Sequence, residues 1–229
     1  MNRFLSQSSR AHGAAFVALG WLSWGCGGQD GTYLLGAGEP GTSAPAPGES
    51  TVTQVLPATP AAGSVIESEH IKTVRGADGS YASEVSAIDM ASWVYFSLRE
   101  KAEVTPDVPE QSPLWDLGFQ RSNVKLNGGV SGTGSVRVAV VSGSFESVTA
   151  PPIEGFQTDA ADEDADGSPD YALSAGDGWY SYDPASHRLT ARETVFVLDT
   201  AGRYFKLQFS SYYDAAGTPG VPQFRWAPL

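Results

Sequence analysis

An acidic segment in the second half of the chain has the spacing of a calcium-binding loop. Calcium takes about six to eight oxygen ligands, and alternate carboxylates on a tight loop can converge on one ion. Gly167 stands at the sixth position, where the turn is sharp, but Leu173 replaces the glutamate that closes an EF-hand loop. A solvated acidic loop is the alternative interpretation. The four expected ligands are Asp162, Asp164, Asp166 and Asp170.

The only cysteine of the chain, Cys26, directly follows a short apolar stretch. Residues 14–22 carry no charge, follow two arginines, and are fewer than the roughly 20 apolar residues that cross a bilayer. They predict a secretory signal, and residues 22–26 resemble the lipobox of bacterial lipoproteins, although Ser23 stands where that motif favours leucine. We therefore expect residues 1–25 to be a signal peptide and Cys26 to be acylated. Acylation would anchor the exported protein at the outer membrane or cell surface. The alternative is a conventional signal peptide in which the cysteine has no role.

The overall charge and the missing motifs limit the function classes. The chain has 26 acidic and 14 basic residues, a formal charge of −12, and such a surface repels phosphate backbones. We expect no nucleic-acid partner. The sequence contains no G-x-S-x-G elbow, P-loop or H-E-x-x-H motif. We therefore expect a binding protein rather than an enzyme, and assign no catalytic residue.

The elements that must position these residues are predicted to be β-strands. The clearest pattern is a hairpin of residues 194–198 and 203–209, in which Phe205, Leu207 and Phe209 share one face. Other runs of β-branched and aromatic residues are separated by Gly, Pro and Asn turn signals. They comprise residues 93–98, 136–141 and 221–226. The pattern predicts an all-β fold, an antiparallel sandwich or barrel-like domain.

A segment poor in apolar residues precedes this domain. Between Gly27 and Gly63 the sequence consists mainly of Gly, Ala, Pro, Thr and Ser without apolar periodicity. Such a composition cannot bury enough surface to offset the entropy cost of ordering. We expect residues 26–63 to be a flexible linker and residues 64–229 to form one β domain.

Several stretches resemble the HmuY family, surface lipoproteins that bind haem. Residues 114–129 are similar to the family pattern W-D-x-x-F/L-x-R-x-x-V-x-x-N-x-G, and residues 93–97 precede it as in the family. The C-terminal part matches through Gly178, Trp179, residues 195–197, Gly202 and residues 206–212. The resemblance implies an all-β domain on a lipid anchor, haem as ligand, and a haem protein or an outer-membrane receptor as partner.

The ligand set that the resemblance implies is incomplete in this chain. The best-known members hold haem iron between two histidines, one of them closely after the Gly-Trp strand, where this chain has Asp183 and Pro184. His187 lies slightly further on, whereas His12 falls in the signal and His70 precedes the matched region. Haem iron accepts imidazole, thioether or phenolate. The candidate haem-binding residues are therefore His187, Tyr182 and Tyr180.

Two functions stay open at the level of the sequence. One is a haem-binding surface lipoprotein that serves in haem acquisition. The other is a calcium-stabilised β-sheet interaction module that kept the fold without haem, since a fold alone does not fix a ligand. In the second case His187 would be an exposed histidine at a hairpin tip.

Overall fold

The computed structural model describes residues 59–163, 165–174 and 178–229. The predicted signal peptide, Cys26 and most of the predicted linker lie outside these residues, as does Asp164. Within the described residues no helix is long and apolar enough to cross a membrane. The only helical element described is a 3₁₀ turn, η1 (Pro109–Gln111).

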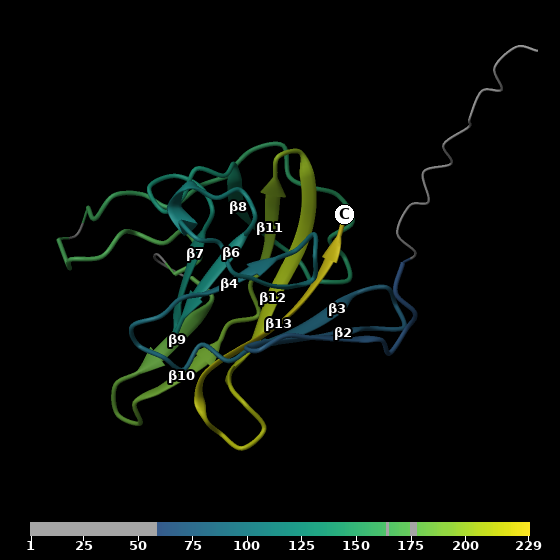
Figure 1. Ribbon diagram of the computed structural model, residues 1–229, viewed down its shortest axis with the longest axis horizontal. Helices are drawn as coiled ribbons and strands as arrows, with labels where there is room; N and C mark the ends of the chain where they lie inside the picture. The colour runs from purple at the N-terminus through teal and green to yellow at the C-terminus, as the bar shows by residue number, and fades with distance from the viewer. Residues whose placement is uncertain (1–58, 164, 175–177) are drawn as a thin grey trace, which may run out of the picture. The chain divides into compact units, whose positions relative to one another are not determined.

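Two antiparallel sheets and one separate hairpin make up the described fold (Figure 1). The seven-stranded sheet has the spatial order β1 (Val65–Glu67), β2 (Ile71–Arg75), β3 (Tyr81–Val85), β13 (Pro219–Pro228), β12 (Arg203–Tyr213), β11 (Val195–Thr200) and β8 (Val136–Val141). The four-stranded sheet has the order β5 (Ala102–Val104), β4 (Val94–Ser97), β6 (Leu117–Gln120) and β7 (Asn123–Leu126). The separate hairpin pairs β9 (Tyr180–Asp183) with β10 (Arg188–Ala191). The predicted all-β, antiparallel fold is confirmed.

Aromatic side chains join the two sheets into one core. Phe119 of β6 stacks on Phe224 of β13 with ring centroids 5.5 Å apart, and Phe96 of β4 meets Trp226 of β13 edge-on at 5.9 Å. All four side chains are almost fully buried. Offset and edge-on pairs are the preferred geometries of aromatic rings, so these contacts stabilise the face-to-face packing of the sheets.

The hairpin predicted for the C-terminal half forms as β11 and β12. Phe196 pairs with Leu207, and the chain turns between Thr200 and Arg203. Ala201 and Gly202 both have positive φ there, 56° and 86°, as a tight two-residue hairpin turn requires. The predicted inward face is confirmed, because Phe205, Leu207 and Phe209 are all buried.

The segment that resembles the W-D…N-G pattern holds one end of the four-stranded sheet together. Asn127, 1% exposed, donates from Nδ2 to the carbonyls of Ser112 and Trp115 and accepts the Gly134 N–H at Oδ1. The neighbouring Asp116 accepts the Leu98 N–H at 2.7 Å. These residues therefore close loops onto the sheet, and their contacts serve folding.

Candidate functional site

The turn of the β9–β10 hairpin contains Asp183 and Pro184, the two residues that stand where relatives carry a histidine. Asp183 pairs with Arg188, and its carboxylate accepts hydrogen bonds from the Ala185 N–H and the Ser186 hydroxyl. His187 has φ +53°, in the left-handed region, where the chain closes the turn. Asp183 and Pro184 therefore form the turn that displays His187 at its end.

The hairpin brings two of the three predicted haem-binding residues together. The Tyr182 hydroxyl lies 2.6 Å from His187 Nδ1, and both residues are exposed. Tyr180 instead packs edge-on against Trp179 at 5.0 Å and joins the core. Trp179 is fully buried and donates Nε1–H to the Ser122 carbonyl, so it is a core residue.

The hairpin is fastened to the seven-stranded sheet through Tyr213. The Tyr213 hydroxyl accepts the Leu189 N–H at 3.1 Å, and the Arg188 guanidinium lies over the Tyr213 ring at 4.7 Å. These contacts hold the first residues of β10, next to the turn, on β12. The imidazole at the tip therefore stands on a fixed support but projects into solvent.

Haem requires an axial ligand and apolar walls around the macrocycle. His187 can supply the axial ligand through Nε2, since Tyr182 hydrogen-bonds to Nδ1 and no hydrogen bond to Nε2 is seen in the described part of the chain. Neither His187 nor Tyr182 lines a cavity that we identify among the described residues. The hairpin thus fits the ligand chemistry of haem but does not enclose it.

The acidic loop is closed by its own carboxylates. Asp162 accepts the backbone N–H groups of Asp166 and Gly167, and Asp170 accepts that of Glu163. Gly167 has φ +93°, the sharp turn expected at this position. Among the residues that the structure describes, which omit Asp164, no group of three or more His, Cys, Asp or Glu side chains is arranged to hold a metal ion. The geometry therefore gives the calcium prediction no support.

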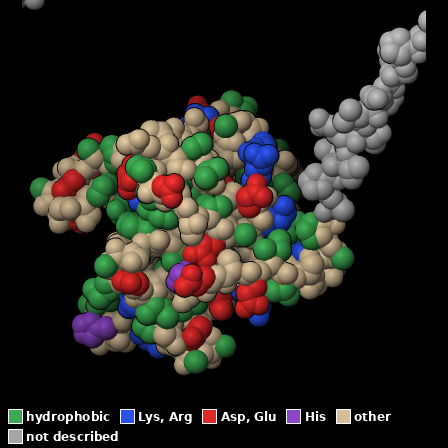
Figure 2. Space-filling view, in the orientation of Figure 1, with side chains coloured by type: hydrophobic (Ala, Val, Ile, Leu, Met, Phe, Trp, Pro, Cys, Tyr) green, Lys and Arg blue, Asp and Glu red, His purple; other side chains and the backbone are tan. Residues whose placement is uncertain are grey.

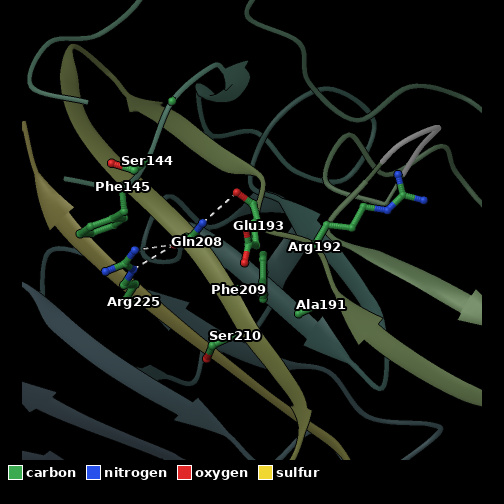
Figure 3. Close-up of a pocket in the computed structure, with 10 residues that line it drawn as sticks. Ser144, Phe145, Ala191, Arg192, Glu193, Gln208, Phe209, Ser210 and Arg225 are labelled. Carbon is green, nitrogen blue, oxygen red and sulfur yellow. Dashed lines mark hydrogen bonds between the residues drawn. The ribbon is translucent and has the colours of Figure 1, made fainter. Parts of the chain in front are cut away.

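The outer face of the seven-stranded sheet carries a groove of about 690 Å³ between β12, β13 and the segment around Phe145 (Figure 3). Its central polar groups bind one another. Arg225 donates to Gln208 Oε1 from Nε and Nη2, and Gln208 donates to the Glu193 carbonyl at 2.8 Å. The Arg225 guanidinium also lies over the Phe145 ring at 4.3 Å. These contacts link β12 and β13 to the neighbouring loops and give the groove a structural role.

A second cavity, of about 550 Å³, lies where the chain passes from one sheet to the other and contains a histidine–glutamate pair. His70 Nδ1 lies 2.8 Å from Glu103 Oε1. Figure 2 shows two separate histidine surfaces on the face in view. The sequence analysis did not single out Glu103. Glu103 lies 33 positions from His70, and only the packing of β2 near β5 brings them together.

Comparison with known proteins assigns the family. The family model described as HmuY protein matches residues 89–226, more than half of the chain. The chain belongs to the HmuY family. No curated protein matches this chain. The match begins after His70 and includes the β9–β10 hairpin.

Two solved structures align with this chain. Apo PinO from Porphyromonas gingivitis aligns with a TM-score of 0.51 and 13% identity over 66% of this chain and 97% of that one. The apo HmuY analog of Tannerella forsythia aligns with a TM-score of 0.49 and 14% identity, over 64% and 94%. At these identities the likeness to PinO supports the fold alone.

Proposed function

We propose that this protein is an exported surface lipoprotein that binds haem and serves in haem acquisition. The observation that carries the proposal is membership of the HmuY family across residues 89–226. As the sequence resemblance implies, members of this family bind haem at the cell surface. Acylation at Cys26 would hold the domain at the membrane, and a haem protein or an outer-membrane receptor would be its partner.

The described part of the chain offers an axial ligand for haem iron in two places. An axial ligand needs one open ring nitrogen, and its second nitrogen is commonly fixed by a hydrogen-bond partner. His187 meets this condition through Tyr182, and His70 meets it through Glu103. Bound haem would supply an iron centre with one or two axial positions for such ligands.

The proposal is tested by titrating the purified mature chain with ferric haem and recording the Soret band. Binding should shift and sharpen the band with saturation at one haem per chain. A mixture of haem and an unrelated acidic β protein of equal concentration serves as control. A spectrum equal to that of free haem throughout the titration, at micromolar concentrations, would remove the proposed function.

A further inference from the structure

We propose that His70, held by Glu103, is the axial ligand through which this protein binds haem iron. The inference rests on the proposed function and names a residue outside the region that matches the family model. It follows from three features of the described structure: the fixed orientation of the His70 ring, the open ring nitrogen, and the cavity beside it.

The His70 side chain is held by one carboxylate at two points. Glu103 Oε2 accepts the backbone N–H of His70 at 2.9 Å, and Oε1 lies 2.8 Å from ring Nδ1. The Ser86 N–H donates to the His70 carbonyl at 2.7 Å. Because the Glu103 side chain is only 11% exposed, the pair is shielded from solvent on that side. Backbone and ring are therefore both fixed before any ligand binds.

This arrangement matches the outer shell of a metal-binding histidine. Such a histidine donates one ring N–H to a carboxylate, which fixes the tautomer and raises the basicity of the other nitrogen. No hydrogen bond to His70 Nε2 is seen among the described residues, and the His70 side chain remains 41% exposed. Nε2 is thus the atom that can coordinate a metal.

The number of ligating groups indicates the class of ligand. No cluster of three or more metal-ligating side chains occurs in the described ranges, so a bare metal ion would find fewer than three side-chain ligands here. A metal already chelated by a macrocycle needs only axial ligands from the protein. A single oriented imidazole beside a cavity therefore suits a metalloporphyrin better than a free ion.

The cavity supplies walls that the β9–β10 hairpin lacks. Its volume of about 550 Å³ falls within the roughly 300–1,000 Å³ of small-molecule and cofactor sites. Ile88, Trp93 and Val94 provide an apolar part of the lining next to His70 and Glu103, and the rest of the lining is polar: Ser86, Asp89 and Ser92. The cavity lies between the seven-stranded sheet, where His70 directly precedes β2, and strands β4 and β5 of the other sheet.

The Trp93 wall is itself held rigidly. The Lys125 ammonium lies over the Trp93 ring at 4.4 Å, and Tyr171 meets that ring edge-on at 5.7 Å. Lys125 also lies over Tyr95 and Trp115, at 5.1 and 5.4 Å. Cation–π contacts of this kind fix ring orientation. A planar ligand would therefore meet a preformed surface.

The test compares variants of the full mature chain by ferric-haem titration and electron paramagnetic resonance. His70→Ala should weaken binding at least about tenfold and lose the imidazole signature, which added imidazole should restore. His70→Met should change the spectrum to that of thioether ligation. The backbone N–H at position 70 still reaches Glu103 in both variants, and circular dichroism checks that they fold.

A second comparison isolates the role of Glu103. Glu103→Gln should weaken ferric-haem binding about 10- to 100-fold, because loss of a partner that orients a metal-binding histidine weakens metal binding by this factor. Glu100→Gln, at an exposed position three residues earlier, is the matched control and should bind as wild type does.

Two results overturn the inference, and they differ from failure of the proposed function. Wild-type affinity and an unchanged spectrum in His70→Ala would remove His70 as ligand while haem binding stands. Loss of the imidazole signature in His187→Ala, with His70→Ala unaffected, would transfer the assignment to the hairpin. Absence of haem binding in the wild type would instead remove the proposed function itself.

Discussion

Replacing Asn127 with alanine tests whether the W-D…N-G segment serves folding. The Asn127 amide makes three hydrogen bonds, at 2.8 Å to the Ser112 carbonyl, 2.8 Å to the Trp115 carbonyl and 3.0 Å from the Gly134 N–H. The substitution removes the hydrogen-bond partner of all three backbone groups. The Trp115 bond is fully buried, whereas the other two are partly buried and can be replaced by water.

The magnitude follows from these differences in burial. An unsatisfied buried partner costs about 1–3 kcal/mol, and a hydrogen bond exchanged for water costs about 0.5–1.5 kcal/mol. We expect Asn127→Ala to lower the free energy of unfolding by about 3 kcal/mol. For a domain of this size each kcal/mol moves Tm by about 2–4 °C, so Tm should fall by about 6–12 °C.

Thermal and urea unfolding followed by circular dichroism measure the effect. Asn123→Ala is the matched control, since Asn123 begins the same strand and makes no side-chain hydrogen bond in the described structure. Asn127→Asp should be worse than alanine at neutral pH, because a carboxylate would face two carbonyl oxygens. Protonation of that carboxyl should recover part of the loss as pH falls towards about 4. A Tm for Asn127→Ala within 2 °C of the Asn123→Ala value would refute the reasoning.

Three further outcomes are expected. Cys26→Ser should release the protein from membranes, since two acyl chains anchor stably where one is marginal; intact mass showing an unmodified chain cut elsewhere would refute this. Burial lowers the pKa of Lys125, which is 6% exposed. The free energy of unfolding of the wild type should therefore rise relative to that of Lys125→Met as pH rises from 7 towards 10.5, as measured by urea unfolding. A difference between the two proteins that does not depend on pH would contradict this prediction. If the acidic loop binds calcium, adding calcium should raise the Tm of the wild type but not that of Asp164→Ala. Identical melting curves in calcium and in chelator would contradict the calcium prediction.

Local patterns predicted the strands better than the sites. The β11–β12 hairpin follows from two-residue periodicity and a turn at Ala201 and Gly202, and both signals are local. Tyr180 was grouped with Tyr182 by proximity in sequence, yet its ring packs on Trp179 in the core. Burial of that kind depends on which sheet covers the strand, which a single sequence does not encode locally.

The histidine–glutamate pair could not be found from spacing. His70 and Glu103 lie on strands or strand ends of different sheets, and their contact depends on the approach of β2 to β5. The sequence shows that Asp183 and Pro184 replace the family's histidine. Only the structure shows that they form the hairpin turn, in which Asp183 accepts hydrogen bonds from Ala185 and Ser186. Long-range packing therefore decides both the candidate ligand and its surroundings.

Native mass spectrometry of the mature chain after incubation with ferric haem and gel filtration tests haem binding most directly. The proposed function predicts one haem retained per chain, with a mass increase equal to one haem. The retained haem should be lost largely from His70→Ala under the same conditions. A chain that carries no haem after incubation at micromolar concentration with either ferric or ferrous haem would contradict the account.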